Sequence, residues 1–123
     1  MTPKSEYTLI EKKSKFLGFV YFVTQKDQID EILTSIKLEH KKATHFCYAY
    51  KISNGQDVVK FSDDGEPSGT AGRPILNVIE KKNLTNILVV VVRYFGGVKL
   101  GAGGLLRAYT KCTSELLRGE ICK

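Results

Sequence analysis

The sequence predicts an α+β domain in which helices pack on a mixed or antiparallel sheet. Two observations predict it. Runs of β-forming residues and segments with helical spacing of apolar residues follow one another in the order β-β-α-β-α-β-α. No linker, internal repeat or low-complexity tract divides the 123 residues, a length that can bury its own core. We therefore expect one domain over residues 1–123.

The first half of the chain carries a predicted hairpin, a helix and a strand. Two β-rich runs, 7–11 and 15–23, flank the polar turn 12–14. A start that resembles a capping box, followed by isoleucines at helical spacing, predicts a helix over about 25–40. Alternating side chains predict the next strand over 43–52.

The second half is richer in glycine. Residues 57–72 are polar and glycine-rich, which predicts one long functional loop. A helix over 74–83 and a buried β-branched strand over 87–92 follow. The glycine loop 96–104 then leads into a last helix, for which Gly119 is the expected C-cap.

The glycine loop is typical of anion sites, because glycines let backbone N–H groups approach a ligand and the following helix adds its positive end. We expect Lys99 and Arg107 to lie near the start of that helix. The spacing matches neither a Walker loop nor a dinucleotide fingerprint, and the alternative that the glycines only permit tight turns stays open. The residues expected to bind an anion or nucleic acid are Arg93, Tyr94, Gly96, Gly97, Lys99, Gly101, Gly103, Gly104 and Arg107.

The second candidate is an acidic loop that concentrates carboxylates and hydroxyls. Its residues are Asp63, Asp64, Gly65, Glu66, Ser68 and Thr70. Asp63, Asp64 and Glu66 are weak candidates for magnesium ligands, and the favoured alternative is that these groups cap turns. We expect the loop to be held by its own turns, so that Gly65→Val or Gly69→Val is more damaging than Glu66→Gln.

Composition narrows the kinds of site, partner and localisation that we expect. We interpret Cys47, Cys112 and Cys122 as free thiols, and His45 with Cys47 is too small a set for zinc. No residue is a convincing nucleophile, so we expect no catalytic residue and no cofactor. The net charge of +6 favours anionic partners. The longest apolar run is too short to span a membrane, so we expect a cytoplasmic protein.

Two long segments, 62–72 and 89–109, resemble the signatures of the YigZ/IMPACT family, and 43–50 and 13–18 resemble two further segments of it. The resemblance implies an α+β fold similar to the second domain of ribosomal small-subunit protein five and the fourth domain of elongation factor G. It also implies a link to translation, because eukaryotic members regulate it. Members of the family usually carry a second domain, and we expect this chain to depart from that plan and to lack it.

Three functions remain as hypotheses, and nothing in the sequence excludes the third of them, a purely structural or assembly role. The first is a non-enzymatic module that binds RNA or a ribosome-associated protein through the basic glycine loop. The second is an enzyme that binds a nucleotide or phosphate, with magnesium on the acidic loop and phosphate on the glycine loop. A cleft lined by both loops would favour a phosphate or metal site, whereas a flat basic surface would favour a polymer.

Overall fold

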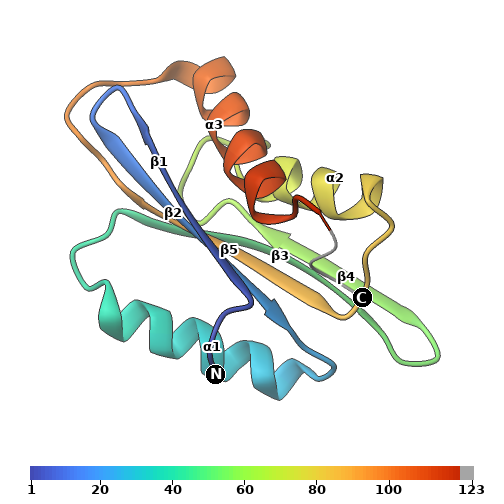
Figure 1. The fold of residues 1–123 in the computed structure, drawn as a ribbon. Coiled ribbons are helices and arrows are strands. Elements are labelled where there is room, and N and C mark those ends of the chain that lie inside the picture. Colours follow the sequence, from blue (N-terminus) through green and yellow to red (C-terminus); the bar gives the residue numbers. More distant parts are fainter. Residues whose placement is uncertain (120–123) are drawn as a thin grey trace.

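The structure, a computed structural model, describes residues 1–119 as one five-stranded sheet with three helices (Figure 1). The strands lie in the order β1-β2-β5-β3-β4, and each neighbouring pair is antiparallel. The α+β class is confirmed. The elements are β1 (Ser5–Glu11), β2 (Ser14–Phe22), α1 (Lys26–Glu39), β3 (His45–Ser53), β4 (Asp57–Ser62), α2 (Gly72–Lys81), β5 (Ile87–Tyr94) and α3 (Gly101–Leu116).

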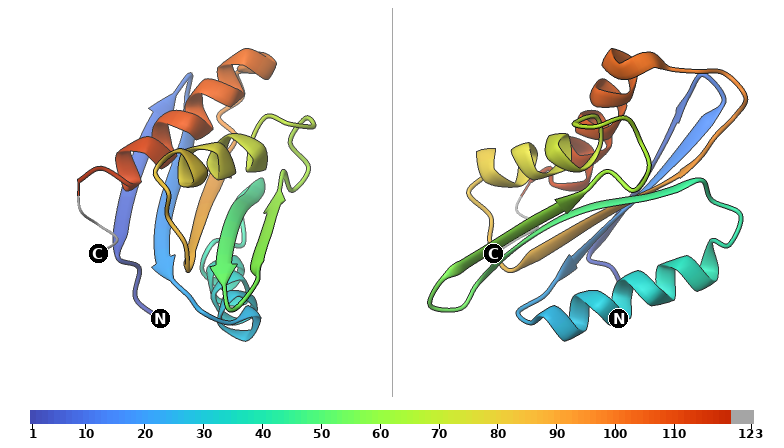
Figure 2. Two further views of the ribbon diagram at one scale, coloured as in Figure 1. Left: turned by 90° about the vertical axis from the view of Figure 1, so that its right-hand side faces the viewer. Right: turned by 180° about the vertical axis from the view of Figure 1, so that it is seen from behind.

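The helices cover both faces of the sheet (Figure 2). Helix α1 lies on one face, where Ile29, Ile32 and Ile36 pack against side chains such as Val90 and Tyr50. Helices α2 and α3 lie together on the other face. Strand β5 is central and is buried on both sides from Ile87 to Arg93, as expected for a β-branched run.

The prediction of one long loop over 57–72 is wrong for the first part of this range, because Asp57–Ser62 forms the edge strand β4. Its residues pair with β3, for example Lys60 with Tyr50, so the observed order is β-β-α-β-β-α-β-α. The β-branched Val58 and Val59 favour this conformation. The residues that remain a loop are 63–71.

The last helix also begins earlier than the glycine content suggests. Gly101, Gly103 and Gly104 lie in the first turns of α3, so the loop before it is only 95–100. The C-cap of α3 is Leu117, and Gly119 follows at a φ of 73°. The predicted C-cap at Gly119 is therefore two residues too late.

A tight hairpin joins β1 to β2 and lies beside the loop that follows β5. Glu11 pairs with Ser14, and the two residues between them, Lys12 and Lys13, have φ angles of 46° and 69°. Positive φ at both central positions defines a type I′ turn. A Cβ atom at Gly96 would overlap the carbonyl of Lys13, so the hairpin tip and the loop are in direct contact.

No helix within residues 1–119 is long and apolar enough to cross a membrane.

Candidate functional site

Two consecutive turns shape the acidic loop 63–71. The N–H of Glu66 donates to the carbonyl of Asp63, and the intervening Asp64 and Gly65 have φ angles of 41° and 86°. This Asp-Gly pair forms a type I′ turn. A second turn is closed by the N–H of Thr70 and the carbonyl of Pro67, with Gly69 at a φ of 81°. The loop is therefore built around its two glycines.

The Asp63 carboxylate holds the loop to the start of helix α2. Oδ1 accepts the N–H groups of Ala71 and Gly72 at 3.1 and 2.8 Å, and Oδ2 accepts that of Gly69 at 2.9 Å. These donors have no partner inside the helix. Asp63 thus acts as a helix cap placed eight residues before the N-cap Ala71.

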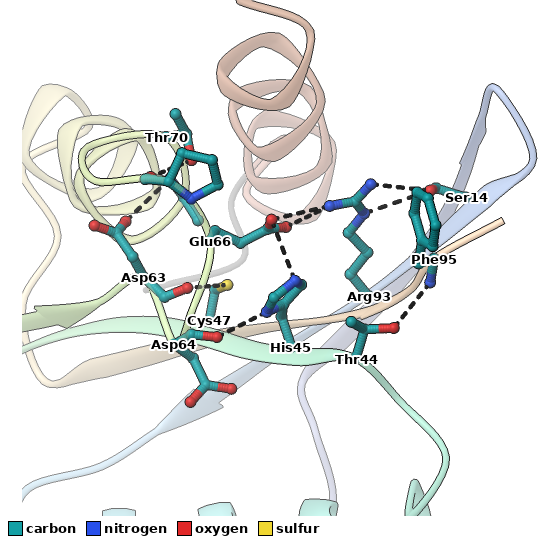
Figure 3. A network of polar contacts seen from close by, with 12 residues as sticks. Ser14, Thr44, His45, Cys47, Asp63, Asp64, Glu66, Thr70, Arg93 and Phe95 are labelled. Atoms are coloured by element: carbon teal, nitrogen blue, oxygen red, sulfur yellow. Dashed lines mark hydrogen bonds and ion pairs between the residues drawn. The ribbon is translucent and has the colours of Figure 1, made fainter. Parts of the chain in front are cut away.

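Asp64 joins the loop to the beginning of β3 (Figure 3). Its carboxylate accepts the N–H of Phe46 at 2.6 Å. Its carbonyl oxygen lies 2.8 Å from Nδ1 of His45. A carbonyl only accepts hydrogen bonds, so Nδ1 of His45 carries a proton.

Glu66 is the centre of a buried polar network. Its side chain is only 2% exposed, and both carboxylate oxygens accept Nη1 of Arg93 at 2.9 Å. The Tyr109 hydroxyl donates to Oε2, and Nε2 of His45 lies 3.3 Å from Oε1. The guanidinium of Arg93 also donates to the buried Ser14 hydroxyl through Nη2 and Nε, at 3.2 and 3.4 Å. A buried charge pair satisfied in this way connects the loop to β5, β3, α3 and β2.

These contacts bear on the expected magnesium ligands. The carboxylates of Asp63 and Asp64 accept backbone N–H groups, and that of Glu66 is bound by Arg93 and Tyr109. Within residues 1–119, no three Asp, Glu, His or Cys side chains gather as a metal-binding group. The favoured interpretation, in which these groups cap turns, fits Asp63 and Asp64. Ser68 lies exposed, and the Thr70 hydroxyl donates to the carbonyl of Pro67.

The buried nucleophiles beside the network are held in their protonated forms. Burial is the main cause that raises the pKa of Cys47, whose thiol lies 3.2 Å from the carbonyl of Asp63. Burial also raises the pKa of Tyr109 and raises that of Cys112 to about 12. Cys47 and Cys112 are free thiols, as predicted, and neither is a thiolate at neutral pH. Cys122 lies outside the described residues.

The acidic and glycine loops line one cleft of about 430 Å³ beside the start of α3. Its polar lining includes Thr44, His45 and Lys99, above the buried pair of Glu66 and Arg93. Its apolar lining is Pro67, Phe95, Leu100, Ala102 and Leu105. The two signature segments of the sequence therefore meet in space, as the cleft hypothesis requires.

A second, smaller hollow of about 260 Å³ lies between the β1–β2 hairpin and α3. Lys12, Arg107 and Lys111 line it, and within residues 1–119 Glu11 is the one acidic residue of this lining. Leu100 lines both hollows, so they lie on either side of this residue. Lys13 is exposed at the adjoining hairpin tip. Lys12, Lys13, Arg107 and Lys111 therefore make this end of the molecule strongly basic, and we call it the basic end.

The structure places the predicted anion-binding residues in different surroundings. Lys99 lines the cleft, whereas Arg107 lies two turns into α3 and lines the basic hollow. The sequence predicts both near the start of the helix: Lys99 lies just before Gly101, the first residue of α3, whereas Arg107 lies in its second turn. Gly97 and Gly101 have φ angles of 90° and 75°. Gly96 allows contact with the hairpin, and Gly103 and Gly104 lie beside Arg107 and Leu100.

Arg93 and Tyr94 differ from the expectation. The Arg93 guanidinium donates to Glu66 and Ser14 and is 5% exposed, so an exposed anion does not reach it without breaking these bonds. Alternation along β5 turns Tyr94 to the opposite face. There its hydroxyl lies 2.6 Å from Nδ1 of His40. Arg93 thus lines the cleft with its guanidinium held by Glu66 and Ser14, and Tyr94 lies away from the cleft.

Sequence reasoning missed Lys12, Lys13 and Lys111 as members of the basic end, and Phe95 as a wall of the cleft. The available signal was the pair of lysines in a two-residue hairpin turn, a position that favours Asn-Gly. Lys111 follows Arg107 by four residues, the spacing of neighbours on one helix face.

Comparisons with known proteins agree with the fold. Residues 12–117 match the Impact N-terminal domain. The IMPACT family member YvyE of Bacillus subtilis is 47% identical over 110 residues, which cover 89% of this chain and 51% of YvyE. The crystal structure of a hypothetical protein is 36% identical, with a TM-score of 0.84, and the match covers 95% of this chain and 59% of that one.

A more distant solved structure is that of the two-domain translational regulator Yih1. It is 26% identical with a TM-score of 0.56, and the match covers 94% of this chain and 45% of Yih1. The chain thus spans about half the length of YvyE and Yih1. The resemblance carried by the two signature segments is confirmed, and the chain belongs to the Impact N-terminal domain family.

Proposed function

We propose that this chain is a non-enzymatic module that binds RNA through its phosphates and acts in translation or its regulation. The observation that carries the proposal is the basic end, where Lys12, Arg107 and Lys111 line one hollow and Lys13 and Lys99 adjoin it. Clustered cations attract the phosphate backbone irrespective of sequence. The likeness to the translational regulator Yih1 supports the link to translation.

The arrangement of the cations also favours a polymer over a single phosphate group. The five side chains come from the β1–β2 hairpin, the glycine loop and helix α3, and all are exposed. Exposed lysines on separate elements suit successive phosphates of a chain, whereas a single phosphate is normally held by converging donors in one pocket. Contact between Gly96 and Lys13 keeps two of these elements together.

Fluorescence anisotropy with a labelled RNA, repeated over a range of salt concentrations, tests the proposal. We expect the triple variant Lys12→Gln/Arg107→Gln/Lys111→Gln to bind more weakly. The slope of log affinity against log salt should fall by roughly 0.7 to 0.9 unit for each lost phosphate contact. The matched control is Lys60→Gln/Lys81→Gln/Lys82→Gln, which removes three exposed lysines that line neither hollow.

Two outcomes would overturn the proposal. One is absence of RNA binding by the wild-type chain at low salt. The other is an equal loss of affinity in the two triple variants, because this would show a response to net charge rather than to the basic end.

The cleft lined by both loops favours a second candidate, a nucleotide- or phosphate-binding enzyme. Its magnesium ligands would have to come from carboxylates that already accept hydrogen bonds from protein groups. Isothermal titration with ATP, with and without magnesium, tests this candidate. Magnesium-dependent binding that Lys99→Gln weakens would favour it over the RNA module.

A further inference from the structure

Phe95 is a large aromatic residue left exposed at the mouth of the cleft. It follows the last residue of β5 directly, and 47% of its surface is exposed. Its N–H donates to the Thr44 hydroxyl oxygen at 3.1 Å, which fixes the backbone at this point. The guanidinium of Arg93 lies 5.5 Å from the ring centroid (Figure 3). The ring is thus supported by the protein and accessible to a ligand.

The walls of the cleft suit a flat, mostly apolar group. Pro67, Leu100 and Leu105 line it together with Phe95. Its volume of about 430 Å³ falls within the usual range of small-molecule pockets, about 300 to 1,000 Å³. A nucleobase has an apolar face and polar edges, and the Thr44 hydroxyl and the backbone of the loops offer partners for such edges.

The charges around the cleft suit a ligand that carries a phosphate. Among the described residues, Glu66 is the only carboxylate that lines the cleft, and it pairs with Arg93 and is 2% exposed. Lys99 lies exposed at the rim. A phosphate attached to a group inside the cleft would therefore meet a cation and no exposed carboxylate of the lining.

The cleft is also continuous with the basic end, since Leu100 lines both hollows. A strand whose phosphates lie along Lys12 and Arg107 can pass over Leu100 and place a base beside Phe95. In a duplex the bases are stacked and paired inside, so only an unpaired nucleotide can enter in this way.

We propose that the cleft receives an unpaired base that stacks on Phe95, so that the chain selects single-stranded over double-stranded RNA. The proposal rests on the RNA-binding function above and names the class of RNA. Stacking of a base on an aromatic side chain is tolerant of sequence, because every base has a π-face. The selection is therefore for strandedness and not for a particular sequence.

The test uses a labelled 12-nucleotide oligouridylate and a labelled duplex of equal length, measured by fluorescence anisotropy. Alanine substitution of a stacking aromatic costs about 1–3 kcal/mol per base, which corresponds to a fall in affinity of roughly 5- to 150-fold. We expect Phe95→Ala to show such a fall for the single strand. Its salt slope and its affinity for the duplex should stay unchanged. Val98→Ala and Leu106→Ala are matched controls, because both side chains are exposed apolar groups outside the cleft lining.

A second variant keeps the test independent of folding. The chain contains no tryptophan, so Phe95→Trp introduces a single tryptophan at the proposed stacking position, whose fluorescence can be excited apart from that of the tyrosines. This variant should retain the affinity for oligouridylate, and its fluorescence should be quenched on binding.

The outcomes separate the two proposals. If the wild-type chain binds neither RNA, the proposed function and this inference both fail. If it binds RNA with a steep salt slope but does not distinguish the two forms, and Phe95→Ala changes nothing, only the base-stacking inference is wrong. In that case the candidate ligand of the cleft would be an apolar side chain of a protein partner.

Discussion

The Tyr109 hydroxyl donates a hydrogen bond to Oε2 of Glu66, the carboxylate oxygen that also accepts Nη1 of Arg93. Tyr109 is fully buried in α3, whereas Glu66 belongs to the acidic loop. Both donors satisfy the carboxylate oxygens, although only 2% of the side chain is exposed. The acidic loop is therefore held by Tyr109 and Arg93 as well as by its own turns.

This network reverses the expected order of damage in the loop. Replacing Glu66 by Gln leaves the Arg93 charge buried without its counterion, and removal of one partner of a buried pair costs about 3–5 kcal/mol. Strain from a non-glycine residue at positive φ costs about 1–3 kcal/mol, so Gly65→Val should be less damaging. Urea denaturation measures each free energy of unfolding.

A control for this prediction is Glu115→Gln, which removes the exposed pair with Arg118 and should change stability by less than about 1 kcal/mol. The double variant Glu66→Leu/Arg93→Met, which removes both charges, should recover part of the stability lost in Glu66→Gln. A loss below about 1 kcal/mol in Glu66→Gln would contradict the prediction.

Two glycines in different backbone conformations should respond in opposite ways to alanine. Gly69 has a φ of 81° with open space around it, so Gly69→Ala should lower stability by about 1–2 kcal/mol through the backbone alone. Gly103 lies in α3 without positive φ, and its new Cβ would meet only the flexible end of Arg107 at 3.3 Å. Gly103→Ala should raise stability by up to about 1 kcal/mol. Thermal melts that shift in the same direction would refute this contrast.

Asp63→Ala should detach the start of α2. The substitution leaves the N–H groups of Gly69, Ala71 and Gly72 without their acceptor, and we expect a loss of about 2–3 kcal/mol. Amide hydrogen exchange should accelerate at these three positions and remain unchanged in α1. Unaltered exchange at Ala71 and Gly72 would show that another group replaces the cap.

Stability should decline at alkaline pH. Burial raises the pKa of Cys112 from 9.0 to about 12, and it also raises the pKa of Cys47 and Tyr109. Above about pH 9 the unfolded chain loses these protons while the folded chain keeps them. The free energy of unfolding therefore falls as the pH rises from about 9 to 12. Urea titrations at several pH values should give a shallower fall in Cys112→Ala. Parallel curves for the two proteins would indicate that the Cys112 thiol ionises in the folded state.

The sequence was sufficient for features that depend on local pattern. The periodicity around Ile29, Ile32 and Ile36 predicted α1, and the β-branched run 87–92 predicted the central strand, because each signal lies within one element. The edge strand β4 was missed, since its residues are exposed on both faces and a polar, glycine-rich loop follows directly.

The site was harder to predict, because it depends on contacts between residues that are far apart in the sequence. Glu66 meets Arg93 across 27 positions and Tyr109 across 43, and no local pattern marks such pairs. Arg93 and Lys99 are both basic and stand six positions apart, on either side of Gly96 and Gly97. Only the fold shows that the first is buried against Glu66 and the second is exposed at the cleft.

The place of β5 in the sheet has a consequence for how the chain folds. The β1–β2 and β3–β4 hairpins are formed from neighbours in the sequence, but they are joined only through β5, which lies between β2 and β3. Until residues 87–94 are synthesised, β2 and β3 each lack the strand that pairs with one of their edges. Long-range pairing of this kind slows folding and leaves unpaired strands exposed on the way. We therefore expect the sheet to close only when β5 pairs with β2 and β3, and the same pairing brings Arg93 beside Glu66 and Ser14.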